Sequence, residues 1–141
     1  PIKSSAASDV YKRQTLIVNT PDREFYCGDV TMLELTTSEG DIGIYAGHIP
    51  LTAVIVPGVM TIHTDEGIKK AAVHGGIIEI LQSQVNVLAE VAEWPEEIDV
   101  NRANEARIRA ERRLKSSDAD VNIVRAEMAL KRSLARINAV D

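Results

Sequence analysis

The feature that most constrains the fold is a change of sequence pattern at Trp94-Pro95. From Thr15 to about Val91, short apolar runs alternate with Gly, Pro, Asn and Asp. From Ile98 to Asp141 the chain contains neither Gly nor Pro and is rich in Ala, Arg and Glu. The first pattern is typical of β-strands joined by turns and the second of helices. The 141 residues therefore have to hold a β-rich part followed by a helical part.

The first part predicts an all-β domain over residues 15–97, either an antiparallel β-sandwich or a barrel. Short runs rich in Val, Ile and Thr, separated by turn residues, are typical of sandwiches and barrels. Thr64–Gly67 has the composition of a hairpin loop, in which Gly supplies the positive φ that such turns need. Residues 1–14 show no clear period and lack an initiator Met. We expect them to be a leader that is non-native or disordered, outside the fold.

The second part, residues 98–141, predicts an antiparallel hairpin of two helices. Asp99 suits the N-cap of the first helix, and Asp118 or Asp120 in the loop "KSSDAD" suits the cap of the second. Apolar residues recur at spacings of three and four on each helix: Ala103, Ala106, Ala110 and Leu114, then Ile123, Ala126, Leu130, Leu134 and Ile137. Two helices of this length are marginal alone in water. The hairpin is therefore expected to pack against another surface and to be able to detach from it.

Charge is divided between the two parts. Residues 15–97 carry three Lys/Arg and thirteen Asp/Glu, a net charge of −10, whereas residues 98–141 carry ten and seven, a net charge of +3. A chain that is acidic overall and has no aromatic residue in its helices is not typical of a nucleic-acid-binding protein. The cationic helices instead suit a phosphorylated ligand or an acidic protein surface.

The usual catalytic patterns are absent from the sequence, which has no G-x-S-x-G, P-loop, H-E-x-x-H or C-x-x-C. Cys27 is the only cysteine, so no internal disulfide forms; we expect a buried core thiol in a reducing compartment. His74-Gly75-Gly76 predicts a β-turn rather than an oxyanion loop. The three histidines have no ligand-like spacing, which argues against a metal site. The sequence thus indicates a binding or mechanical role, with no catalytic residues and no catalytic cofactor.

Five segments of the chain resemble the epsilon subunit of bacterial F-type ATP synthase: "TPDREFYCGDV", "SEGDIGIYAGHIPLTAVIVPGVMTI", "HGGIIEI", "AEWPEEIDVNRA" and "AEMALKRSLARI". The resemblance extends from about Thr15 to the C-terminus. It implies a flattened ten-stranded β-sandwich followed by a mobile two-helix hairpin. It also implies a non-catalytic rotor subunit of the central stalk in the proton-translocating enzyme. Such a subunit links gamma to the c-ring and inhibits ATP hydrolysis through an ATP-responsive hairpin.

The same resemblance implies the partners and the location. The partners are the gamma subunit and the c-ring, the alpha and beta catalytic subunits in the inhibitory state, and ATP as a regulatory ligand. Nucleic acid is not among them, and membrane contact occurs only through the complex. The location is peripheral, at the cytoplasmic face of the bacterial plasma membrane. Asp41 and His48 fall at positions that meet gamma or the c-ring loops in the family.

A candidate ATP site lies at the start of the helical part. Residues 98–103, "IDVNRA", match the family's ATP-binding pattern I/L-D-x-x-R-A. One face of the predicted helix carries, at steps of three, four and three, Asp99, Arg102, Ala106 and Arg109. Guanidinium groups match phosphate oxygens well. The resemblance assigns the ATP-binding role to Glu93, Ile98, Asp99, Arg102, Ala103, Arg109, Arg132 and Arg136.

Two alternatives remain open at this point. Several opposite charges lie four residues apart, as in Glu105–Arg109, Arg107–Glu111, Glu111–Lys115 and Glu127–Lys131. Such pairs are common on any solvated helix, so the arginines need not bind a ligand. The chain is then a purely structural adaptor without nucleotide binding. A stand-alone ATP-binding sensor or adaptor module is the other alternative.

Overall fold

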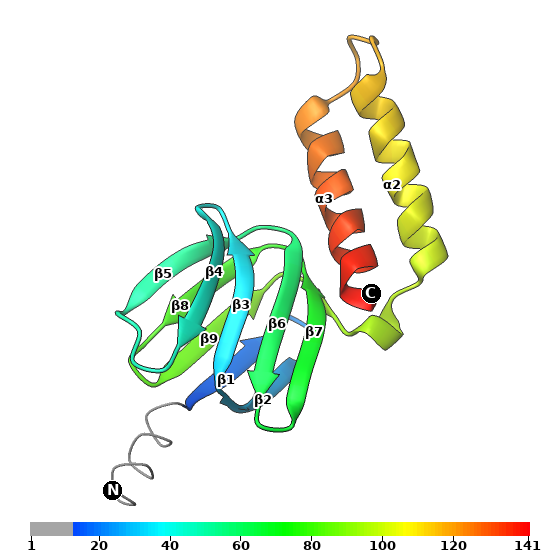
Figure 1. Ribbon diagram of the computed structural model, residues 1–141. Coiled ribbons are helices and arrows are strands. Elements are labelled where there is room, and N and C mark those ends of the chain that lie inside the picture. Colours follow the sequence, from blue (N-terminus) through cyan, green and yellow to red (C-terminus); the bar gives the residue numbers. More distant parts are fainter. Residues whose placement is uncertain (1–12) are drawn as a thin grey trace, which may run out of the picture.

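The computed structural model describes residues 13–141, which form ten strands, one short 3₁₀ helix and two α-helices (Figure 1). The strands are β1 (Gln14–Asn19), β2 (Glu24–Val30), β3 (Met32–Thr37), β4 (Gly40–Tyr45), β5 (Leu51–Ile55), β6 (Gly58–Thr64), β7 (Gly67–Val73), β8 (Gly76–Ile80), β9 (Gln84–Ala89) and β10 (Ala92–Glu93). The helices are η1 (Pro95–Glu97), α2 (Val100–Lys115) and α3 (Ile123–Val140).

The ten strands form a folded-over sheet in the order β10-β7-β6-β3-β5-β8-β9-β1-β2, with β4 paired to β3. A single residue pair, Thr37 with Ile55, joins β3 to β5. The sheet bends there into two layers, so the predicted ten-stranded sandwich is confirmed (Figure 1). One pairing differs from the expected antiparallel pattern, because β1 runs parallel to β9.

The core lies between the two layers. Buried and partly exposed residues alternate along β1, as the period of a strand requires. The largest fully buried side chains come from both layers: Leu16, Val18, Val30, Leu33, Ile44, Met60, Ile62, Val73, Ile78, Ile80, Val85 and Val87. Gln14 Nε2 donates a hydrogen bond to the carbonyl oxygen of Ile44, at 2.8 Å, and so links β1 to β4. The strand begins at this residue, one position before the expected domain start, while residues 1–12 of the expected leader lie outside the described residues.

Cys27 corrects one expectation, since its side chain is exposed rather than buried in the core. On β2 this residue pairs with Ile17 of β1, which lies on the face opposite to the buried residues Leu16 and Val18. Because side chains alternate between the two faces of a sheet, Cys27 points away from the core. Which face a single residue takes depends on the pairing of β1 with β2, which is not contained in the local sequence.

The predicted hairpin of two helices is confirmed, and its ends are capped by side chains. The carboxylate of Asp99 accepts a hydrogen bond from the backbone N–H of Arg102 at 3.1 Å, as expected for an N-cap. The second helix is capped by Asn122, whose side chain accepts from the N–H of Arg125 at 3.1 Å. Asp118 and Asp120 lie earlier in the loop and do not cap α3. No helix within residues 13–141 has the length and apolar character needed to cross a membrane.

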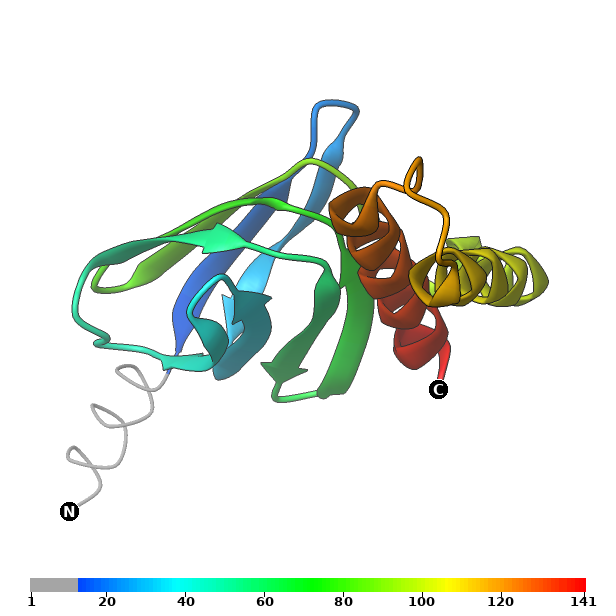
Figure 2. The ribbon, with the colours of Figure 1, turned by 90° about the horizontal axis from the view of Figure 1, so that it is seen from above.

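Helix α3 lies between α2 and the sandwich, as the view from above shows (Figure 2). Its contact with the sheet is made of small side chains, with Ala72 of β7 packed against Ala135 and Ala139. Val59 and Ile98 flank this alanine cluster. A seam of alanines allows close approach of the backbones but buries little apolar area for each residue.

The apolar stripe expected on α3 is only partly right. Ala126 is buried as expected, but Ile123 is 58% exposed and Leu134 is 38% exposed. The helix instead buries small residues on two faces, because it has a neighbour on each side. Ala126 and Ser133 are seven residues apart and share one face, whereas Ala135 lies on a nearly opposite face that packs on Ala72.

Candidate functional site

A cavity of about 400 Å³ lies where the sandwich joins the hairpin. Its wall comes from β10, η1, α2 and α3, and consists of Glu93, Glu97, Asp99, Arg102, Ala103, Ala106, Arg109 and Arg136. Three of these side chains are carboxylates and three are guanidinium groups. Its volume falls within the range of ordinary small-molecule sites.

Six of the eight residues predicted for ATP binding line this one cavity: Glu93, Asp99, Arg102, Ala103, Arg109 and Arg136. Ile98 lies outside its lining and packs against the alanine cluster between α3 and β7. Arg132 also lies outside, one helical turn before Arg136 and farther from the junction. The structure therefore gathers most of the predicted set around one cavity, from segments more than forty positions apart in the sequence.

Two of the cavity's arginines have no anionic partner. Within residues 13–141, neither Arg102 nor Arg109 has a carboxylate oxygen within salt-bridge distance. Of the four opposite-charge pairs expected on the helices, only Arg107–Glu111 forms, at 2.9 Å. Most charges on α2 therefore form no ion pair along the helix. The guanidinium groups of Arg102 and Arg109 are available to bind an anion.

The carboxylate of Glu93 is the best-connected group of the cavity. Its Oε1 atom accepts a hydrogen bond from Nε of Arg136 at 2.8 Å and another from Nε2 of His74 at 2.9 Å. Arg136 belongs to α3, and His74 follows β7. One oxygen at the end of β10 therefore receives donors from the hairpin and from the sandwich at once.

These contacts hold the pKa of Glu93 below its usual value. The hydrogen bond from His74 is the largest cause, and the hydrogen bond and charge of Arg136 add to it, while partial burial acts in the opposite direction. A lowered pKa means that the ionised carboxylate is favoured in the docked structure. The contribution of Arg136 to this lowering exists only while α3 is docked, so docking is expected to be stronger when Glu93 is ionised.

Glu97 is a cavity residue that the sequence did not reveal. Both of its carboxylate oxygens accept from Arg23 at 2.7 Å, and Oε1 also accepts from the backbone N–H of Trp94 at 2.9 Å. The hydrogen bond from Arg23 is the main reason that the pKa of Glu97 is lowered. The indole of Trp94 stacks on Phe25 with 4.1 Å between ring centroids. The spacing from Trp94 to Glu97 is that of a helix cap, but the pairing with Arg23 could not be read from the sequence.

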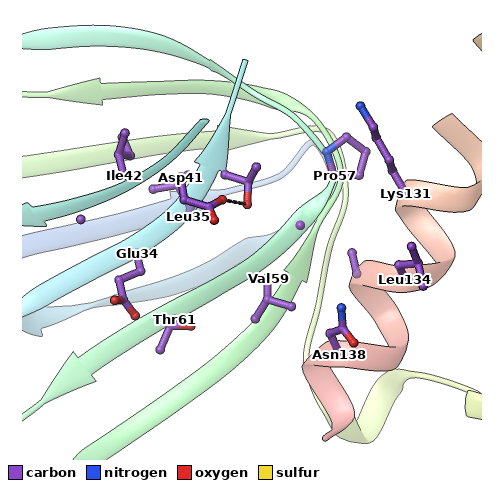
Figure 3. Close-up of a pocket in the computed structure, with 14 residues that line it drawn as sticks. Glu34, Leu35, Asp41, Ile42, Pro57, Val59, Thr61, Lys131, Leu134 and Asn138 are labelled. Atoms are coloured by element: carbon purple, nitrogen blue, oxygen red, sulfur yellow. Dashed lines mark hydrogen bonds between the residues drawn. The ribbon is translucent and has the colours of Figure 1, made fainter. Parts of the chain in front are cut away.

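The two residues predicted to contact partners lie at opposite ends of β4, away from this cavity. His48 Nδ1 is 2.7 Å from the carbonyl oxygen of Ile49. The carboxylate of Asp41 accepts from the hydroxyl of Thr36 at 2.7 Å and faces a second cavity, of about 610 Å³, between the sheet and α3 (Figure 3). Lys131, Leu134, Ala135 and Asn138 form the α3 side of that second cavity. The partner role of Asp41 and His48 stays a prediction.

Two family models together match all of the described residues, 13–141. Residues 13–95 match the model of the ATP synthase delta/epsilon chain beta-sandwich domain, and residues 96–141 match that of the delta/epsilon chain long alpha-helix domain. These matches confirm the family expected from the sequence. They also support the prediction of a non-catalytic subunit rather than an enzyme in its own right.

Curated relatives agree over most of their length. The ATP synthase epsilon chain of Caldanaerobacter subterraneus subsp. tengcongensis is 45% identical over 123 residues, covering 86% of this chain and 89% of the relative. That of Halalkalibacterium halodurans is 42% identical, covering 88% and 96%. Among solved structures, a chain of the Euglena gracilis mitochondrial ATP synthase has a TM-score of 0.80, covering 92% of this chain and 82% of that chain. At 22% identity it supports the fold alone.

The position of Glu93 predicts a pH-dependent docking of the hairpin. Because Arg136 lowers the pKa of Glu93 only in the docked state, its stabilisation of docking is present above the ordinary carboxyl range, near 4.5, and is lost as pH falls through the lowered value. Methyl NMR signals of Ala135 and Ala139, which pack on Ala72, should report the loss of docking. The substitution Glu93→Gln should weaken docking by about 1 kcal/mol at neutral pH, a value reduced by partial exposure of the carboxylate.

The matched control is Glu127→Gln, which removes an exposed carboxylate from α3, the helix whose docking is measured. This variant should keep the acid transition of the unsubstituted protein, whereas Glu93→Gln should remove most of it. An acid transition of equal size in both variants would contradict the role given to Glu93.

Proposed function

The chain belongs to the ATP synthase delta/epsilon chain family, and we propose that it acts as a central-stalk rotor subunit whose hairpin responds to ATP. In this role it links gamma to the c-ring of the proton-translocating enzyme and restrains ATP hydrolysis by the alpha and beta subunits. It lies at the cytoplasmic face of the bacterial plasma membrane and contacts the membrane only through the complex. Its ATP is a regulatory ligand, bound without hydrolysis.

The observation that carries the ATP proposal is the gathering of six candidate residues around one cavity. Arg102 and Arg109 supply guanidinium groups that lack a carboxylate partner in the described chain. These groups suit the phosphates, because planar guanidinium groups bind phosphate oxygens in pairs. The carboxylates of the wall suit the amino group of the base as acceptors. The small side chains of Ala103 and Ala106, which also line the cavity, leave space for the ring.

A ligand in this cavity would stabilise the docked hairpin, because the wall combines β10, α2 and α3. It would contact Arg102 and Arg109 from α2, Arg136 from α3 and Glu93 from the sandwich, and would hold three elements together. A ligand that binds only one of two states shifts the population towards that state. Without ATP, the undocked hairpin presents a segment of net charge +3 to acidic surfaces of the catalytic subunits.

The sandwich offers apolar surface for the rotor partners. Val54 on β5, Ile77 on β8 and Leu88 on β9 are neighbours across adjacent strands, and their exposed fractions are 55%, 47% and 58%. Ile49, next to His48, is 79% exposed. A continuous exposed apolar row of this kind suits a protein interface. We assign the row of Val54, Ile77 and Leu88 to gamma and the end of the sandwich around His48 to the meeting of gamma and the c-ring loops.

The ATP proposal predicts which arginines matter. Substitution of Arg109 by Ala should weaken ATP binding by about tenfold or more in calorimetry, as expected for the loss of a charge-assisted hydrogen bond. Arg112→Ala, an exposed arginine of the same helix outside the cavity wall, should leave the affinity near that of the unsubstituted chain. No ATP should be hydrolysed. Absence of heat with millimolar ATP would contradict the nucleotide proposal and leave the structural adaptor.

The rotor proposal predicts co-purification with gamma and the c-ring. Ile77→Lys should disrupt the complex with gamma, because it places a charge in the middle of the apolar row. Ile68→Lys on β7 is the matched control, since Ile68 is also exposed, at 61%, but lies in the other layer. Equal loss of gamma with both variants would contradict the assigned surface, and a pull-down that contains neither gamma nor c-ring would favour the stand-alone sensor.

A further inference from the structure

We propose that His74 is a positioning residue that fixes the hairpin on the sandwich by orienting Glu93 towards Arg136. The residue is not part of the cavity wall, and its proposed effect on docking of the hairpin does not require a ligand. The inference therefore goes beyond the ATP response, and it can hold or fail independently of that proposal.

The imidazole of His74 is buried and makes a single hydrogen bond. Its side chain is 3% exposed, and Nε2 lies 2.9 Å from Oε1 of Glu93. The other ring nitrogen, Nδ1, is buried and has no hydrogen-bond partner within residues 13–141. A buried polar atom without a partner costs free energy, so an apolar side chain would pack here at lower cost. The contact with Glu93 is the one feature of the site that requires the imidazole.

The turn around His74 leaves the imidazole little freedom to move. Its backbone N–H donates to the carbonyl oxygen of Val91 at 2.9 Å, and the N–H of Glu90 donates to the carbonyl oxygen of Gly75 at 3.1 Å. Gly76 has a φ of +122°, and a Cβ at this position would overlap the backbone of Leu88 and Ala89. His74-Gly75-Gly76 thus forms a tight turn that is hydrogen-bonded to the connection between β9 and β10. Glu93 follows this connection, on β10.

His74 can position Glu93 because His74 and Arg136 both bind the same carboxylate oxygen, Oε1. A glutamate side chain has several rotatable bonds, and its carboxylate would otherwise sample several orientations. Because His74 holds Oε1 from the sandwich side, the same atom is presented to Nε of Arg136 on α3. The partial exposure of Glu93 and Arg136, at 23% and 32% of their side chains, leaves room for such alternative orientations if His74 is removed.

The docking of α3 is sensitive to this contact because the rest of its interface with the sandwich is small. The apolar part consists of Ala72, Ala135 and Ala139 with two partly buried neighbours. Within residues 13–141, the contact of Arg136 with Glu93 is the salt bridge that connects α3 to the sandwich. A change in the orientation of the Glu93 carboxylate therefore removes a large part of the interaction between α3 and the sandwich.

The test is amide hydrogen exchange of the full chain without ATP, comparing His74→Leu with His74→Gln. Leucine removes the donor but fills the space, whereas the amide nitrogen of glutamine takes a position close to that of Nε2 and keeps a donor. We expect His74→Leu to accelerate exchange in α3 by about tenfold, as for loss of a hydrogen bond to a charged group. His74→Gln should restore most of the protection, and His74→Leu should add little in an Arg136→Ala background.

The matched control is His63→Leu, which breaks the other His–Glu contact of the described chain, between His63 and Glu34 at 3.0 Å on β6 and β3. Exchange in α3 should not change in this variant. The inference is overturned if His74→Leu leaves α3 unchanged, if His74→Gln is as damaging as His74→Leu, or if β1 and β9 lose protection to the same extent as α3. The last result would mean that His74 only supports the sandwich core.

Discussion

The carboxylate of Glu93 is the contact on which the position of the hairpin depends. It lies on the last strand of the sandwich, accepts hydrogen bonds from His74 and Arg136, and forms part of the cavity wall. Most of the remaining contact between α3 and the sheet is made by alanines. Such a seam aligns the helix but contributes little free energy. A polar contact with a small apolar seam is suited to an element that must detach, because neither part is strong alone.

Much of the architecture follows from sequence periods. Short apolar runs before Trp94 predict the strands, and the absence of Gly and Pro after Ile98 predicts the two helices. The periods do not show which element packs against each face of a helix or strand. Helix α3 was expected to bury one stripe that included Leu134, whereas it packs on α2 with one face and on Ala72 with another. The exposure of Cys27 depends on how β2 pairs with β1, and the parallel pairing of β1 with β9 depends on strand order; local sequence specifies neither.

The candidate site was more predictable on α2 than elsewhere. Asp99, Arg102 and Arg109 share a helical face by spacing alone, and all three line the cavity. The role of Glu97 is not visible in the local sequence, because its partner, Arg23, is 74 positions away. The local sequence around His74 indicates only a turn, because its contact with Glu93 spans 19 positions. Contacts between distant segments depend on the fold as a whole, and no local pattern records them.

In this mechanism the hairpin is a separate unit, less stable than the sandwich, and ATP strengthens its docking. The most direct test is a map of amide hydrogen exchange in α2 and α3 with and without ATP, with β1 and β9 as the internal reference. We expect the hairpin to exchange faster than these strands without ligand, and we expect ATP to slow exchange in α2 and α3 while the strands do not change. A hairpin as protected as the sandwich without ATP, or one that ATP leaves unchanged, would contradict it.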